Sequence, residues 1–321
     1  MSTTSVPAPP APSSGQSTRD LLRTVDRRRR RTDRIMRVLV AAAFVLAMAP
    51  LVSLVWTVVA NGVERLSPYF LSHSMRGVFG GMDAGGIYHA IVGTVEITLF
   101  AALISVPVGI MVAVYLVEYG RGALAKSVTF FVDVMTGIPS IVAGLFAYAL
   151  FAVLLGPGVK MGVVGSVALS VLMIPVVVRS CEEMLRLVPD ELREAALALG
   201  VPRWLMVVKV VLRTAVAGIG TGVMIAIARV IGETAPLLIT VGVIDSINYN
   251  LFEGRMMTLP VYVYRQYSQG LTPCNDASVA CIPDIAYLRA WAAALVLILI
   301  VMLLNLVARL ITRMFAPKLP R

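Results

Sequence analysis

Residues 214–244 read TAVAGIGTGVMIAIARVIGETAPLLITVGVI, and only two of these 31 residues, Arg229 and Glu233, carry a charge. About 20 apolar residues are enough for a helix to cross the hydrocarbon core of a bilayer. The segment therefore predicts a membrane span. A continuous helix of this length would measure about 46 Å, which is more than a span needs. We expect a break near residues 232–236, beside the two charges, where an interrupted helix can line a pathway.

Five other segments of the chain are long and free of charge. They cover residues 38–60, 97–117, 134–159, 161–178 and 290–308. Across the chain 58% of the residues are hydrophobic and 14% are charged, with a mean hydropathy of +0.86, whereas soluble domains carry about 25% charged residues. Gly218 and Gly222 have the spacing that lets helices approach closely in lipid. The sequence predicts an all-α polytopic membrane protein with six transmembrane helices.

The net charge of +10 is distributed unevenly along the chain. Nine arginines lie between Arg19 and Arg37, directly before the first apolar segment. A DNA-binding arm is one interpretation, but such a cluster is typical of a cytoplasmic flank held at anionic lipid, so membrane lipid and not nucleic acid is the expected partner. Six spans then place both termini in the cytoplasm. The predicted cytoplasmic segments hold 21 of the 28 Lys and Arg, and they are residues 1–37, 118–127, 179–213 and 309–321.

The cysteines and histidines do not indicate a metal site. Three cysteines and two histidines show no spacing that fits a metal site, so neither a metal nor a cofactor is expected. Cys274 and Cys281 lie in a polar segment that the predicted topology places outside the cytoplasm, where disulfides form. A disulfide across this short loop and two free thiols both fit the sequence.

The predicted cytoplasmic loop 179–213 carries clear helix signals. Pro189 and two acidic residues stand in a first turn and Gly200 follows the last periodic residue, which predicts a helix over about residues 189–199. Its apolar stripe consists of Leu192, Ala195, Ala196 and Leu199. This stripe fits either a helix that rests on the membrane surface or a socket in which another protein packs against the short alanines.

The same loop carries a family resemblance. Its residues of fixed type and spacing are Glu194, Ala195, Ala196, Gly200, Val210, Val211 and Leu212. They are similar to the loop signature of ABC importer permeases, which implies that Glu194, Ala195, Ala196 and Gly200 dock an ATP-binding subunit. Arg213 stands where that family usually has Pro, which affects the local geometry entering the next span. The chain has no Gly-Lys dipeptide and hence no Walker A loop, so ATP hydrolysis would belong to a partner and this chain is not an enzyme.

The charges inside the quoted segment have two interpretations. Arg229 and Glu233 are four residues apart, so on a helix they share a face and can pair. An arginine at the bilayer centre costs about 2.5–3.5 kcal/mol, so it should face protein or water. Either the pair locks two helices together, or the planar guanidinium binds an oxyanion such as phosphate. In the second case Glu233 positions Arg229 or accepts a proton from a substrate hydroxyl, which fully ionised sulfate lacks.

Two further segments extend the resemblance. Residues 228–238 read ARVIGETAPLL and closely resemble the signature of the PstA family of phosphate transport permeases, and residues 137–142, GIPSIV, are also similar to this family. The continuation after Thr234 distinguishes PstA from the paired permease PstC. The resemblance covers about residues 90–310. It implies the type I ABC importer permease fold and places Arg229, Glu233 and Thr234 in the phosphate pathway.

The resemblance also implies an assembly and a location. The expected partners are a PstC-like second permease, two copies of a PstB-like ATP-binding subunit and an external PstS-like phosphate-binding protein, in a bacterial inner membrane. The expected organisation is a basic cytoplasmic tail, a first transmembrane helix, an external loop, a permease core and a second cytoplasmic tail, over residues 1–34, 35–61, 62–90, 91–310 and 311–321.

Two other functions compete with a phosphate permease. A sulfate or molybdate permease of the same architecture would show no preference for phosphate. A membrane-anchored enzyme or signalling scaffold would not need an ATPase partner. Against the latter, the sequence shows no nucleophile and base arrangement, and its two histidines, His73 and His89, both lie in the first predicted external loop.

Overall fold

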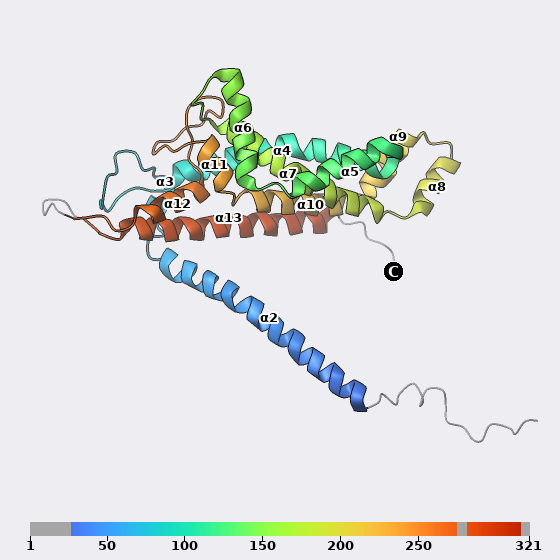
Figure 1. Cartoon of the computed structure of the whole chain (residues 1–321), viewed down its shortest axis with the longest axis horizontal. Helices are drawn as coiled ribbons and strands as arrows, with labels where there is room; N and C mark the ends of the chain where they lie inside the picture. Colours follow the sequence, from blue (N-terminus) through green and yellow to red (C-terminus); the bar gives the residue numbers. More distant parts are fainter. Residues whose placement is uncertain (1–26, 275–280, 316–321) are drawn as a thin grey trace, which may run out of the picture. The chain divides into compact units, whose positions relative to one another are not determined.

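The computed structural model describes residues 27–274 and 281–315, and their regular structure is helical (Figure 1). The helices of the first half are α2 (Arg27–Gly62), α3 (Pro68–Ser72), α4 (Tyr88–Val114), η1 (Tyr115–Tyr119), α5 (Gly122–Thr136) and α6 (Ser140–Leu155). Those of the second half are α7 (Gly162–Arg186), α8 (Asp190–Ala198), α9 (Arg203–Met206), η2 (Val207–Val211), α10 (Leu212–Val230), α11 (Ala235–Thr240), α12 (Leu259–Gln269) and α13 (Ile285–Phe315). Both η1 and η2 are single π-helical turns that continue the preceding α-helix.

The chain divides into two units, and the first ends at Thr57. Its described part is most of α2, whose residues 38–57 carry no charge, so the helix is apolar on every side. A helix of this kind faces lipid or other protein. The sequence expectation of a membrane span over residues 38–60 falls within α2.

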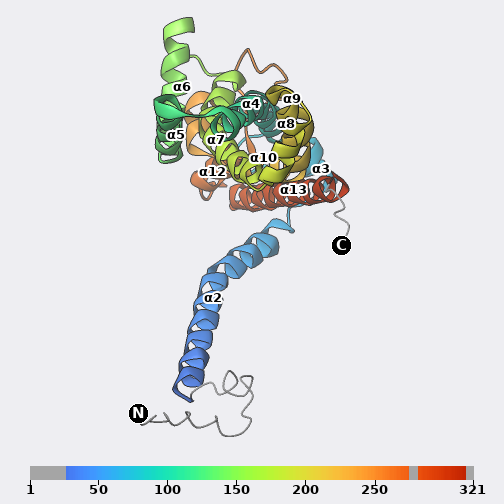
Figure 2. The ribbon, with the colours of Figure 1, turned by 90° about the vertical axis from the view of Figure 1, so that its right-hand side faces the viewer.

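The second unit, from Val58 onward, is built around α7. This helix packs against α4 on one side and α10 on the other, and α10 packs against α13 (Figure 2). Serines on α7 bond to backbone on α4, since Ser166 Oγ donates to Ile97 O at 3.0 Å. On the other side a Cβ added at Gly222 would lie 2.6 Å from Cβ of Ser180. The glycine spacing in residues 218–222 therefore serves close packing of α10 on α7.

Segments predicted to share one side of the membrane meet at the same end of this bundle. Helices α8 and α9 lie at one end, beside the end of α4, while α3 and α12 lie at the other (Figure 1). Helix α12 packs against α13 and α4, and Leu259 N donates to Thr94 Oγ1 at 2.8 Å. The two ends of the bundle are thus formed by different segments, and the loop 179–213 lies at one of them.

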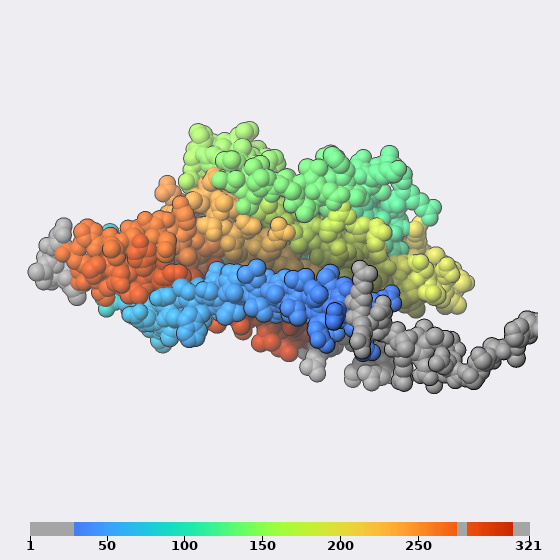
Figure 3. Space-filling view, turned by 60° about the horizontal axis from the view of Figure 1, so that its bottom comes forward, coloured from blue at the N-terminus to red at the C-terminus, as the bar shows by residue number. Residues whose placement is uncertain are grey.

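The apolar segment 134–159 is not the single continuous span expected from the sequence. Helix α5 ends at Thr136 and α6 begins at Ser140, and the two helices meet at an angle of 107°. Pro139 explains the break, because a proline disfavours helical backbone at the residue before it. Both helices stand out from the rest of the second unit as separate green projections (Figure 3).

The fold class is nevertheless confirmed. Five helices are long and apolar enough to cross a membrane, and the bent pair α5–α6 makes six if it counts as one span. Helix α4 begins at Tyr88, well before the predicted start at residue 97. Its first turns are polar yet buried, because His89 and Thr94 face the inside of the bundle.

Candidate functional site

The long apolar segment 214–244 contains the expected break. Helix α10 ends at Val230, a turn follows over Ile231 and Gly232, and α11 starts at Ala235. Pro236 stands at the start of α11, a position where its missing N–H leaves no hydrogen bond unmade. The break therefore lies between two helices of one apolar segment, as the excess length predicts.

Arg229, Glu233 and Thr234 surround this break. Arg229 is exposed in the last turn of α10, whereas Glu233 and Thr234 are half-buried in the turn that follows. No atom outside the immediate backbone comes within 4 Å of a Cβ added at Gly232. The break thus leaves open space beside an exposed guanidinium.

The predicted pairing of Arg229 with Glu233 is not formed. Among the ion pairs of residues 29–274 and 281–310, none joins these two side chains. Because α10 ends at Val230, the helical geometry that brings residues i and i+4 together does not extend to Glu233. Arg229 keeps its donors available, and the interpretation of the pair as a helix lock loses its structural basis.

Helix α6 packs against α11, the helix that follows the break. A Cβ added at Gly144 would lie 2.7 Å from Cα of Pro236, so α6 and α11 approach at backbone distance. Leu237 is buried in the main hydrophobic core and fixes α11 from its other side. The segment 137–142, singled out in the sequence, forms the bend that directs α6 toward α11.

The predicted docking helix is present as α8, and its four site residues divide into two groups. Glu194 and Ala195 are exposed, while Ala196 is buried in the main core beside Val188. The expected apolar stripe is therefore split: Leu199 is 84% exposed and only Ala196 faces the protein's own interior. The outward-facing side of α8 thus carries Glu194 and Ala195, with Leu199 exposed after its last residue.

Gly200 ends this helix for a conformational reason. Its φ is +77°, a left-handed value that residues with a Cβ adopt at a cost. Gly200 N donates to Leu197 O at 2.9 Å and Val201 N donates to Ala196 O at 3.2 Å. These two bonds form a Schellman motif, which satisfies the last carbonyls of the helix.

A buried ion pair anchors α8, and the sequence analysis did not identify it. Glu118, on η1, is 5% exposed, and Arg193 Nε donates to its Oε1 at 3.0 Å. Arg193 also donates to Leu185 O at 2.8 Å and to Val188 O at 2.6 Å. Arg203, at the start of α9, donates to Glu118 O and lies over the ring of Tyr119. The only signal in the sequence is a carboxylate at the end of an apolar run.

A second ion-pair group joins α5 to α7. Arg179 contacts both Asp133 and Glu182, and Arg186 donates to the other oxygen of Glu182 at 2.7 Å. Asp133, near the end of α5, thus bonds across to α7. These charges lie toward the same end of α7 as the loop that carries α8.

At the opposite end, Cys274 and Cys281 are joined by a disulfide, with 5.7 Å between their Cα atoms. The third cysteine, Cys181, is free and buried. Within residues 27–274 and 281–315, no group of three His, Cys, Asp or Glu side chains is placed to hold a metal.

Comparison with known proteins identifies the family. Residues 105–321 match the family model of the binding-protein-dependent transport system inner membrane component. The phosphate transport system permease protein PstA 1 of Mycobacterium tuberculosis is 45% identical over 294 residues, which cover 91% of this chain and 92% of the relative. PstA of Pasteurella multocida is 36% identical over 260 residues, covering 80% and 86%.

Solved structures agree on the fold. A chain of a bacterial alginate ABC transporter, in complex with an alginate-bound periplasmic protein, matches with a TM-score of 0.59 at 13% identity, over 89% of this chain and 96% of that one. A chain of the inward-facing MetNI methionine ABC transporter matches with a TM-score of 0.54 at 20% identity, over 72% and 95%. By sequence and by fold, this chain belongs to the inner-membrane permeases of binding-protein-dependent ABC transporters, and within them to the PstA family.

Proposed function

We propose that this chain is a permease subunit of an ATP-driven importer of inorganic phosphate, and that the anion passes the break between α10 and α11. The observation that carries the proposal is Arg229, in the middle of an apolar segment. It is exposed beside open space, and no carboxylate of the described part of the chain pairs with it. Family membership supports the anion, because the relatives are phosphate transport permeases.

Arg229 and Glu233 would contact different parts of the bound phosphate. The guanidinium donates several N–H groups in a plane and stays charged at physiological pH, so it can bind two oxygens of a phosphate. Glu233 and Thr234, half-buried in the same turn, would contact the anion on its other side. A carboxylate accepts a hydrogen bond from protonated phosphate but repels sulfate, which has no proton to donate, and this favours phosphate over sulfate.

The break is exposed on the surface of this chain, which supports a second permease subunit as the other wall of the pathway. An exposed arginine in an apolar segment is costly in contact with lipid. A PstC-like subunit with a similar break would enclose Arg229 and leave water and substrate as its neighbours. The external phosphate-binding protein, PstS-like, would deliver the anion to the end that carries α3 and α12.

Helix α8 would dock one of two PstB-like ATP-binding subunits. Its outward face, with Glu194 and Ala195, supplies the contact surface, and Gly200 sets the turn at its end. Arg193 ties α8 to the end of α4 through Glu118, so a displacement of α8 would move α4 with it. This end of the bundle is then cytoplasmic, as are both termini, in a bacterial inner membrane.

Phosphate uptake tests this function. Cells that lack the chain are complemented with wild type, Arg229→Gln or Arg76→Gln at matched membrane levels, and uptake of labelled phosphate is compared with uptake of labelled sulfate. Arg76 is exposed on the first external loop and controls for loss of a charge. We expect Arg229→Gln to lower phosphate uptake by about tenfold or more, because a hydrogen bond to a charged group contributes about 1.5–3 kcal/mol.

Three outcomes would contradict the proposal or a part of it. If neither anion depends on the chain, phosphate is not its substrate. If wild type restores sulfate uptake as well as phosphate uptake, a broader oxyanion permease is the better description. Normal transport by Arg229→Gln would remove this arginine from the pathway.

A further inference from the structure

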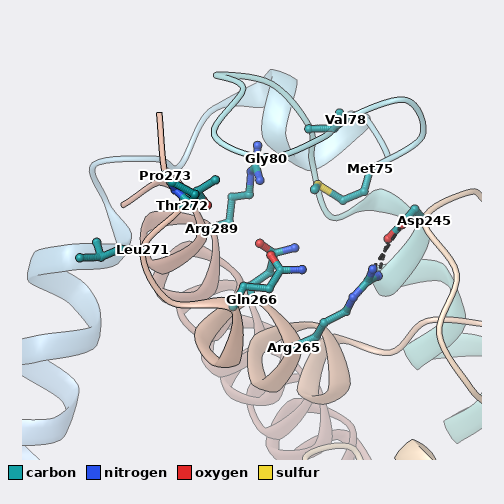
Figure 4. Close-up of a pocket in the computed structure, with 11 residues that line it drawn as sticks. Met75, Val78, Gly80, Asp245, Arg265, Gln266, Leu271, Thr272, Pro273 and Arg289 are labelled. Carbon is teal, nitrogen blue, oxygen red and sulfur yellow. Dashed lines mark hydrogen bonds and ion pairs between the residues drawn. The ribbon is translucent and has the colours of Figure 1, made fainter. Parts of the chain in front are cut away.

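A polar pocket lies at the end of the bundle opposite to α8, and Arg229 is not among its lining residues. It has a volume of about 350 Å³ and is lined by the loop around Met75, by Asp245, and by polar residues of α12 and α13 (Figure 4). Since one water takes about 30 Å³, the pocket has room for a small anion and several waters.

The deepest charge in this pocket is Arg289, on α13, which is only 2% exposed. Its Nε and Nη2 donate to the carbonyls of Ala84 and Met82, at distances of 2.6–3.2 Å. No carboxylate pairs with Arg289 among the ion pairs of the described residues. A buried guanidinium without a counter-ion is costly, and its Nη1 makes none of the hydrogen bonds just described.

The surrounding charges do not neutralise Arg289. Arg265 donates to Asp245 at 2.5 Å, and Arg65 pairs with Asp83. Each of these two carboxylates already has its own arginine. Among the described residues, these two pairs leave Arg289 as the arginine of this region that no carboxylate pairs with.

Gln266 supplies an unused polar group at the same place. It is 2% exposed, its Oε1 is buried without a hydrogen-bond partner, and its amide lies between Arg289 and Arg265 in Figure 4. A buried amide oxygen of this kind is unfavourable unless a hydrogen-bond donor reaches it. The pocket thus offers an unpaired guanidinium beside an acceptor that lacks a donor.

From this arrangement we infer that the pocket is an external binding site for protonated phosphate, separate from the break at Arg229. Phosphate oxygens would accept hydrogen bonds from the N–H groups of Arg289 and Arg265, and a P–OH group would donate to Gln266 Oε1. Sulfate and a lipid phosphodiester satisfy the arginines but have no proton for Gln266. The inference rests on the proposed function only for the identity of the anion.

Equilibrium binding of labelled inorganic phosphate tests this site. The full chain is purified in lipid-free detergent with Arg229→Gln as the background, so that the membrane site does not contribute. In this background Gln266→Glu places a carboxylate next to the anion, and we expect phosphate affinity to fall by about tenfold or more. The control is Gln269→Glu, which makes the same charge change one turn along α12, where the side chain is exposed at the pocket rim, and should cost about threefold or less.

The melting temperature without phosphate guards against misfolding. In Gln266→Glu the new carboxylate can pair with Arg289, so this variant should melt no lower than its parent while losing phosphate binding. Sulfate should compete with phosphate about tenfold less well, because it lacks the proton for Gln266.

Three results would overturn the inference. The first is the absence of saturable phosphate binding in the Arg229→Gln background, and the second is equal phosphate affinity in Gln266→Glu and Gln269→Glu. The third is displacement of phosphate when phosphatidylglycerol nanodiscs replace detergent, which would assign the pocket to a lipid head group. These results are distinguishable from failure of the proposed function. Uptake that does not depend on the chain would contradict transport yet leave binding at Gln266 unaffected.

Discussion

At the scale of single residues, the positions of Arg229 and Gly200 are explained by the conformation of the backbone around them. Arg229 stays exposed because the helix ends one residue after it, and Gly200 is required because its φ is +77°. In both cases the sequence singles out the residue, and the structure shows that a helix stops at or beside it.

Gly200→Ala tests the conformational role of the glycine that ends α8. Neither Gly200 nor Gly220 has an atom within 4 Å of an added Cβ, so the two sites differ in backbone conformation and not in space. We expect Gly200→Ala to lower the free energy of unfolding by about 1–2 kcal/mol, since a left-handed backbone is disfavoured for alanine. Gly220→Ala, inside α10, should be neutral or stabilising by up to about 1 kcal/mol.

Thermal melting of the purified chain, together with co-purification of the ATP-binding subunit, measures both effects. Loss of co-purification in Gly200→Ala alone would connect the turn to docking. Equal melting temperatures for the two variants would show that the Schellman turn does not contribute to stability.

At the scale of elements, ion pairs between helices define which segments move together. Arg193 joins α8 to η1 across 75 residues of sequence, and Arg179 joins α7 to α5. The side chain of Glu118 is 4% exposed and that of Arg193 15%, so water screens this pair little. Helix α8, the proposed docking helix, is therefore tied to a helix of the bundle core.

Arg193→Ala tests this connection. Removing one partner of a buried ion pair leaves an unpaired charge, and we expect the free energy of unfolding to fall by about 3–5 kcal/mol. Arg186→Ala is the matched control, because this side chain is 64% exposed and its partner Glu182 keeps Arg179. The control should cost about 1 kcal/mol or less.

The measurement is melting temperature alongside phosphate uptake and the ATPase rate of the assembled complex. Arg193→Ala combined with Glu118→Ala should recover part of the stability, because no charge then remains buried without a partner. If Arg193→Ala and Arg186→Ala cost the same, the buried pair does not anchor α8.

At the scale of the whole molecule, the two ends of the bundle have different chemistry. One end carries α8 and the buried pair at Glu118, and the other carries the disulfide, α12 and the pocket of Arg289. The distribution of Lys and Arg along the chain predicts that the first end is cytoplasmic. This orientation follows from charge alone and is open to direct measurement.

Labelling of single cysteines in intact cells tests the orientation. With Cys274 and Cys281 replaced by Ser, we expect a membrane-impermeant maleimide to label Ser268→Cys and not Glu194→Cys; both positions are exposed at opposite ends of the bundle. Cys181 is buried and should stay unlabelled in either variant. After the membrane is permeabilised, Glu194→Cys should react as well. The reverse pattern would invert the topology.

Features that depend on local composition can be predicted from the sequence alone. The apolar segments, the break near Gly232 and the helix before Gly200 follow from segment length, bilayer thickness and the residues that end a helix. The bend at Pro139 depends on the same local chemistry. Because the residues on both sides of it are uniformly hydrophobic, the sequence nevertheless predicts one continuous span. The resemblance to the PstA family likewise follows from short runs of residues, such as 228–238.

Contacts between residues that are distant in sequence are visible only in the folded structure. The contact of Arg193 with Glu118, and the bond from Arg289 to Met82 O across 207 residues, join segments whose helical periodicity carries no information about their partners. The same holds for Ala196, which faces the core although its neighbours in the stripe do not. Periodicity fixes which residues share a face of a helix, whereas packing of the whole bundle decides what that face contacts.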